Sequence, residues 1–165
     1  MEVRFKIAEE RDIEGIIQLC NACFNEDTPL EYAKAVFQKT KDTGRDFYIV
    51  GVVGEEVIAH AKITIVETMY QPMMTYAILN HVCVKPDYRR FKIATHMLTE
   101  IENVCKKKGC VKMELWTMTL QMTQNKKIQD LLYFKGKIEE TNIIVKREEK
   151  AKTDYNLSIM VSINI

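Results

Sequence analysis

One segment of this chain constrains its fold more than any other. An apolar run at residues 77–84 leads through a short basic turn, residues 86–92, into an amphipathic stretch at residues 93–105. The run predicts a buried strand, and apolar residues at helical spacing in the stretch predict a helix that packs on a sheet. Free main-chain N–H groups and the positive end of the helix dipole meet at such a turn. It is therefore a place to bind a phosphate group.

Hydrophobic periodicity predicts the other elements. Strands are expected at residues 2–8, 47–53, 57–66, 111–115, 141–145 and 155–163, and helices at 13–23, 30–41 and 121–134. The element order is β-α-α-β-β-β-α-β-α-β-β. A helix between two strands implies a parallel crossover, and short links imply antiparallel neighbours. The expected fold class is α/β (mixed α+β), with a mixed, mostly antiparallel twisted sheet of about seven strands flanked by about four helices.

Size and charge narrow the class of protein. A chain of 165 residues is expected to form a single domain, residues 1–165, with a core of its own. The net charge of +1 gives no electrostatic case for nucleic acid or an anionic membrane as a partner. Apolar stretches are shorter than a membrane span, and the first residues follow a strand pattern rather than a signal peptide. A cytoplasmic protein is expected.

The five cysteines suit a reducing compartment and no disulfide framework. Cys20 and Cys23 have Cys-x-x-Cys spacing, but they fall late in a predicted helix, whereas redox pairs usually lie at a helix N-terminus. No second pair at zinc spacing accompanies them. Buried small side chains are therefore expected here, with no metal site, and a redox role remains the alternative.

Residues 84–94 resemble the coenzyme A pyrophosphate loop of the GNAT superfamily of N-acetyltransferases. The family pattern is Val-x-Pro-x-Tyr-Arg-Gly-x-Gly-Ile-Gly/Ala, and the matching residues are Val84, Pro86, Tyr88, Arg89, Ile93 and Ala94. Arg90 and Lys92 stand where the family usually has glycine, which lets the backbone approach the pyrophosphate. The predicted element order is also similar to that of the family over nearly the whole chain.

The resemblance implies that acetyl-coenzyme A is the cosubstrate. Its pantetheine arm would pair with the strand before the loop, and its pyrophosphate would meet main-chain N–H groups of the turn, with Arg89 or Arg90 adding charge. The alternative is a basic turn that only caps a helix. The implied coenzyme-binding residues are Val82, Cys83, Val84, Arg89, Arg90, Phe91, Lys92, Ile93, Ala94, Thr95 and Asn125.

The resemblance also implies positions for an acid and a base. Many members carry a glutamate where this chain has Asn80, which cannot act as a base, whereas the adjacent His81 can. Neighbouring strand residues point to opposite faces, so only one of the two is expected to face the substrate cleft, and a structural histidine is the alternative. The family's tyrosine falls at Leu132. Tyr133, one residue later, is the candidate acid or a packing residue.

The resemblance therefore implies an N-acetyltransferase that moves an acetyl group to a primary amine of a small molecule or a protein by direct attack in a ternary complex. The alternative is a GNAT-fold acyl-CoA-binding module with weak or no catalytic activity. Glu26 and Asp27 lie in the link that borders the acceptor cleft in this family, where they would favour a cationic amine or simply be solvated. Glu114 is expected at the surface, and a role in proton transfer through a water is the alternative. A homodimer is left open.

Overall fold

The computed structural model describes residues 2–70, 73–119, 141–148 and 156–164. Its strands are β1 (Arg4–Ile7), β2 (Asp46–Val53), β3 (Glu56–Glu67), β4 (Thr75–Val84), β5 (Lys112–Thr119), β6 (Thr141–Glu148) and β7 (Asn156–Asn164). Its α-helices are α1 (Ile13–Phe24), α2 (Leu30–Thr40) and α3 (Ile93–Lys107). Two 3-10 turns, Glu10–Asp12 and Pro86–Tyr88, precede α1 and α3. The helix expected at residues 121–134 lies outside the described residues.

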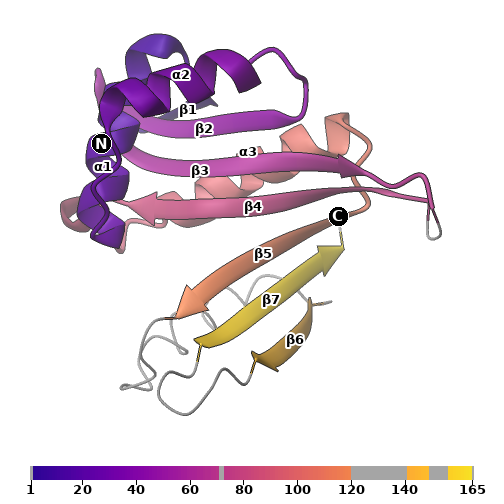
Figure 1. Cartoon of the computed structure of the whole chain (residues 1–165). Coiled ribbons are helices and arrows are strands. Elements are labelled where there is room, and N and C mark those ends of the chain that lie inside the picture. Colours follow the sequence, from indigo (N-terminus) through magenta and orange to yellow (C-terminus); the bar gives the residue numbers. More distant parts are fainter. Residues whose placement is uncertain (1, 71–72, 120–140, 149–155, 165) are drawn as a thin grey trace.

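The strands join in one mixed sheet in the order β1-β2-β3-β4-β5-β7-β6 (Figure 1). The β4–β5 pair is parallel, and the other neighbouring pairs are antiparallel. The chain reaches β5 from β4 through α3, as the expected crossover requires. The mixed, mostly antiparallel α/β architecture predicted from the periodicity is confirmed.

Helices cover both faces of the sheet (Figure 1). α3 packs on one face through Ile93, Met97, Ile101 and Cys105, which are at most 4% exposed. α1 and α2 cover the other face and form a second buried cluster with β2 and the end of β4. Burying a large aliphatic side chain contributes about 1.5–3 kcal/mol. The helical stripe seen in the sequence of α3 is therefore the surface that anchors the loop before it.

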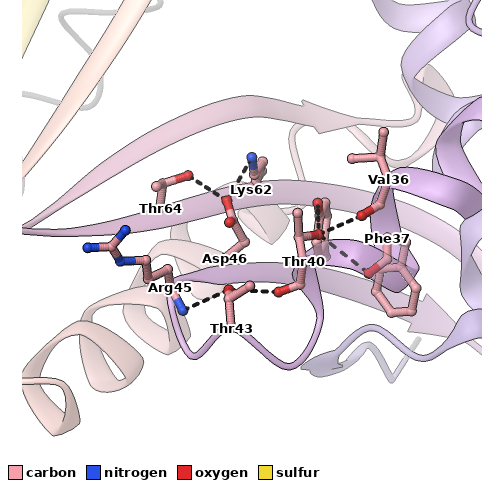
Figure 2. A network of polar contacts seen from close by, with 9 residues as sticks. Val36, Phe37, Thr40, Thr43, Arg45, Asp46, Lys62 and Thr64 are labelled. Atoms are coloured by element: carbon pink, nitrogen blue, oxygen red, sulfur yellow. Dashed lines mark hydrogen bonds and ion pairs between the residues drawn. The ribbon is translucent and has the colours of Figure 1, made fainter.

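A polar network ties the end of α2 to the sheet (Figure 2). The Thr40 hydroxyl donates to the Val36 carbonyl oxygen at 3.0 Å and lies 2.8 Å from the Tyr48 hydroxyl oxygen. On the neighbouring strands, the Asp46 carboxylate accepts from Lys62 Nζ at 2.8 Å and from Thr64 Oγ1 at 2.9 Å. These contacts satisfy polar groups at the border of the core, which would otherwise be costly to desolvate.

Within the described ranges, no helix is both long and apolar enough to cross a bilayer.

Candidate functional site

The parallel strands β4 and β5 pair over only part of their length. The paired residues run from Tyr76 opposite Lys112 to Leu79 opposite Leu115. β4 continues to Val84, whereas β5 turns away from it (Figure 1). Along the described chain, β4 residues 80–84 therefore have no strand partner on the β5 side. A strand edge of this kind presents main-chain donors and acceptors to an extended ligand.

A β-bulge interrupts β4 at this edge. His81 and Val82 together lie opposite a single residue of β3, Ala61, so the register shifts there. His81 has φ 51°, which is the left-handed region. A bulge leaves one residue out of the ladder and changes which face the following side chains take. Leu79 accordingly packs in the α3 cluster, whereas Cys83, four residues later, packs in the α1–α2 cluster.

The bulge removes the basis for the expectation that Asn80 and His81 point to opposite faces. That rule assumes regular alternation, which ends where His81 adopts a positive φ. The His81 side chain is half exposed, and Asn80 is half-buried. Nothing in the sequence marks this bulge, because no glycine or proline stands near it in β4.

The exposed ring of His81 faces two residues at the end of α1. Its Nε2 lies 3.9 Å from Glu26 Oε1. Its ring meets the Phe24 ring edge to face, with the centroids 5.6 Å apart. This grouping of aromatic ring, carboxylate and imidazole was missed by the sequence analysis, which named Glu26 and His81 separately. The two elements are 55 residues apart in sequence, and only the packing of α1 on the sheet brings them together.

The turn between β4 and α3 is tied down by side chains at its start. Tyr88 OH donates to Glu56 Oε2 at 3.0 Å, and Lys85 Nζ bonds the other oxygen of the same carboxylate. These two hydrogen bonds lower the pKa of Glu56. The motif residue Tyr88 thus fixes the turn to the start of β3.

Arg89 is engaged within the protein. Its N–H donates to the Pro86 carbonyl oxygen at 3.1 Å, and its Nε donates to the Val84 carbonyl oxygen at 3.0 Å. A second guanidinium nitrogen lies 3.8 Å from Cys23 Sγ. Arg89 therefore joins the turn to α1 and β4. The exposed cationic side chains of the described turn that make no such contact are Arg90 and Lys92.

The first turn of α3 offers the free donors that the sequence predicts. Lys92 is the N-cap, and its carbonyl oxygen accepts the His96 N–H at 3.0 Å. The N–H groups of Ile93, Ala94 and Thr95 come earlier and have no acceptor within the helix. They point out of the helix N-terminus together with the positive end of its dipole. An anion is stabilised at this position.

The two residues that replace the family glycines both have positive φ. Arg90 has φ 71° and Lys92 has φ 60°. Glycine adopts this region freely, whereas for other residues the conformation is unfavourable by about 1–2 kcal/mol of free energy. The turn thus keeps a backbone conformation that suits glycine without having glycine at either position. Successive N–H groups in turns of this kind form concavities that bind anions.

Substitutions at Lys92 are expected to reveal the strained backbone. Lys92→Gly is expected to be about 1 kcal/mol more stable than Lys92→Ala, because only alanine has a Cβ to strain at φ 60° while both lose the charge. Thermal unfolding of the two variants measures the difference. The matched control is Lys106 within α3, where glycine is expected to be about 1 kcal/mol less stable than alanine. Equal stabilities of the Lys92 variants would contradict the left-handed conformation.

The structure places most of the predicted coenzyme-binding residues together. Val82 and Val84 pack toward α3, and Cys83 packs toward α1. Their main chains lie on the edge of β4 that has no strand partner on the β5 side, where the Val84 carbonyl oxygen accepts from Arg89 Nε. Arg90, Phe91 and Lys92 are exposed in the turn that follows. Asn125 and the candidate acid Tyr133 lie outside the described residues, and their roles stay predictions.

Glu114 is not at the surface, contrary to the sequence expectation. It is 9% exposed, and its Oε1 accepts from Lys112 Nζ at 2.6 Å. The same ammonium lies 5.0 Å from the centroid of the Tyr76 ring. The pairing compensates the carboxylate for its burial, which explains how an acidic residue occupies this place.

The cysteines form two groups that the sequence did not reveal. Cys20 and Cys23 of α1 lie against Cys83 of β4, and Cys105 lies near Cys110. Burial raises the pKa of Cys105 to about 12. All five are free thiols, and Cys20, Cys83, Cys105 and Cys110 are buried. Among the described residues, no group of histidine, cysteine, aspartate and glutamate is arranged to hold a metal ion.

Comparisons with known proteins find similarity to acetyltransferases. The model of the acetyltransferase (GNAT) family matches residues 13–127. An N-acetyltransferase from Staphylococcus aureus Mu50 is similar in structure, with a TM-score of 0.72, 14% identity and 99% of each chain covered. A NatC complex bound to Gag peptide and CoA is also similar, with a TM-score of 0.71 and 14% identity. The match covers 100% of this chain and 99% of that one.

A third similar structure is glucosamine-6-phosphate N-acetyltransferase from Arabidopsis thaliana. Its TM-score is 0.69 at 14% identity, and 93% of this chain and 99% of that one are covered. At these identities the likeness shows the shared fold. A comparison with curated protein sequences finds no match.

Proposed function

This chain belongs to the acetyltransferase (GNAT) family, a family of acyltransferases, and we propose that it transfers the acetyl group of acetyl-coenzyme A to a primary amine of a small molecule or a protein. In this proposal residues 1–165 act as one acetyltransferase domain, in the cytoplasm. A binding module without activity is not favoured, since the family model that matches is one of acetyltransferases and similar structures are named as N-acetyltransferases.

The observation that carries the proposal is the unpaired edge of β4, which runs directly into a basic turn and the N-terminus of α3. Three sets of groups that suit coenzyme A therefore follow one another along the chain. Main-chain groups of Val82 to Val84 suit the amide groups of a pantetheine arm. The N–H groups of Ile93 to Thr95 suit a pyrophosphate, and the charges of Arg90 and Lys92 are nearby.

The chemistry follows from groups at the same edge. His81 takes a proton from the amine, and the amine nitrogen then attacks the thioester carbonyl carbon. A main-chain N–H at the bulge stabilises the negative charge that develops on the carbonyl oxygen. The carbon–sulfur bond breaks, and the coenzyme A thiolate leaves and takes up a proton. Tyr133 remains our predicted donor of that proton. No covalent enzyme intermediate is required, because Cys83 is buried toward α1.

The acceptor class stays broad in this proposal. One structural neighbour is by name a glucosamine-6-phosphate N-acetyltransferase, and another was solved with a peptide and CoA. Both a small molecule and a polypeptide amine are thus compatible with this fold. Acetyl transfer is tested by thiol release from acetyl-coenzyme A across a panel of such amines.

Coenzyme binding is expected to depend on the basic turn. The double variant Arg90→Glu/Lys92→Glu is expected to weaken acetyl-coenzyme A binding at least tenfold, because it places negative charge beside the pyrophosphate. Isothermal titration calorimetry measures the affinity of each protein. Lys106→Glu/Lys107→Glu, at the opposite end of α3, is the matched control and should bind like the wild type. A wild-type protein that takes up no acetyl-coenzyme A at millimolar concentration would refute the proposal.

A further inference from the structure

We propose that Phe24, Glu26 and His81 form the receptor for the acceptor's ammonium group, so that the acceptor is an amine that is positively charged at neutral pH. This inference rests on the proposed function and names the substrate class of the same site. Glu26 holds the ammonium, His81 removes its proton, and the Phe24 ring lies beside the carbon that bears it.

The loop that carries Glu26 is fixed by its own hydrogen bonds. Asn25 ends α1 with φ 57°, and the Glu26 N–H donates to the Asn21 carbonyl oxygen at 3.1 Å. The Asn21 side chain then clamps Thr28, since its Oδ1 accepts the Thr28 N–H at 3.1 Å and its Nδ2 donates to the Thr28 carbonyl oxygen at 3.3 Å. A C-cap and an amide clamp therefore set the position of Glu26 before any ligand arrives.

The distance between the two polar atoms suits a bridging nitrogen. Glu26 Oε1 and His81 Nε2 are 3.9 Å apart, which is too long for a direct hydrogen bond. An ammonium nitrogen about 2.8–3.0 Å from each atom spans that separation and donates one proton to each. The side chains of Glu26 and His81 are 40% and 50% exposed, so a ligand can reach both.

Phe24 gives the receptor an aromatic wall. Its side chain is 41% exposed although it is large and apolar, and its ring contacts the His81 ring. An aromatic ring next to a carboxylate attracts a cation and the alkyl carbon attached to it. A neutral polar ligand gains less from either group.

The receptor lies at the edge where acyl transfer is proposed. His81 occupies the bulge, within the stretch of β4 that has left β5. Its left-handed backbone is a strained conformation for a residue other than glycine, and such strain concentrates at functional sites. Among the described residues, the other titratable groups that interact with this cluster are Cys20 of α1, which is near Glu26, and the buried His60 of β3, which is near His81.

The proton balance of the step is simple. The ammonium bound between the two side chains gives one proton to His81 Nε2, and the neutral amine keeps its hydrogen bond to the Glu26 carboxylate. The nitrogen lone pair freed in this way is the nucleophile of the proposed transfer.

The test is nuclear magnetic resonance of the histidine rings in protein labelled with ¹⁵N-histidine. The chain has three histidines, so His60 and His96 serve as internal references. Benzylammonium chloride is the probe, and benzyl alcohol with equal sodium chloride is its neutral counterpart. Only the His81 resonances are expected to shift, and only with benzylammonium. Glu26→Gln is expected to weaken this response at least tenfold, because a charged acceptor is lost. Asp27→Asn, which alters the adjacent carboxylate, is expected to respond like the wild type.

Three results would each overturn the inference: no His81 shift in the wild type, equal shifts with benzyl alcohol, or an unchanged response in Glu26→Gln. The thiol-release assay separates this inference from the proposed function. If the protein transfers acetyl but His81 does not respond to benzylammonium, only the proposed ammonium receptor is wrong. If His81 responds to benzylammonium but the protein transfers acetyl to no amine, the proposed function is wrong and the ammonium-binding site is still supported.

Discussion

Replacing His81 by asparagine is expected to lower kcat/KM for acetyl transfer by about 10²- to 10⁴-fold, the usual contribution of a general base. Asparagine is the informative substitution, because it tolerates the left-handed backbone that His81 adopts at φ 51°. It removes the imidazole while leaving the bulge, and with it the main-chain N–H groups of the strand edge, in place. The affinity for acetyl-coenzyme A should therefore stay at the wild-type value.

Three measurements on His81→Asn decide this prediction. Steady-state thiol release gives kcat/KM, calorimetry gives the acetyl-coenzyme A affinity, and thermal unfolding shows whether the bulge is kept. Wild-type turnover in a folded variant would mean that water or another group takes the proton. Loss of coenzyme binding together with turnover would mean that His81 supports the strand edge rather than the proton transfer.

Acidification from pH 7 to pH 4 is expected to remove about 3 kcal/mol of folding free energy through His60 alone. His60 is 3% exposed, its Nδ1–H donates to the Ile49 carbonyl oxygen at 3.0 Å, and its ring stacks on Tyr48. Burial lowers the pKa of His60 from 6.5 to about 4, which the Ile49 hydrogen bond opposes only in part.

Acidification lowers the stability because the unfolded state binds the proton at a higher pH than the folded state does. The unfolded chain binds a proton at this residue as the pH falls below 6.5, whereas the folded protein resists it until about pH 4. The contribution is therefore complete above pH 6.5, falls by about 1.4 kcal/mol for each pH unit below that, and is lost below pH 4.

Urea unfolding at a series of pH values measures this contribution. His60→Gln is the comparison, because its amide nitrogen can still donate to Ile49 while the side chain no longer titrates. All other side chains are the same in the two proteins, so the difference between the two curves isolates His60. Parallel curves for the two proteins would show that His60 accepts a proton in the folded state at no cost.

Much of the fold was predictable from the sequence because its signals are local. The stripe of Ile93, Met97 and Ile101 has helical spacing, and it indeed packs on the sheet. The parallel β4–β5 pair follows from a helix placed between two apolar runs, since a parallel strand cannot be reached by a short turn. The free donors at Ile93 to Thr95 follow from the geometry of any helix start.

Burial of single polar residues was less predictable. Glu114 alternates with apolar neighbours and looks like a surface residue, yet it is buried, and its ion pair with Lys112 compensates for the burial of its charge. Whether such a pair is buried depends on which other parts of the chain pack over that face of the sheet. Strand periodicity carries no information about that packing. The clustering of Cys20 and Cys23 with Cys83 has the same origin, because it requires α1 to lie on the end of β4.

The sequence by itself determined the order of the elements, the basic turn and the helix N-terminus, because hydrophobic periodicity and helix geometry act over a few residues. Only the tertiary structure decided the conformation of the site. The bulge at His81 comes from the register between β3 and β4, and the meeting of His81 with Glu26 comes from the packing of α1 against that strand. The turn between β4 and α3 places Arg90 and Lys92 at positive φ, against their own backbone preference.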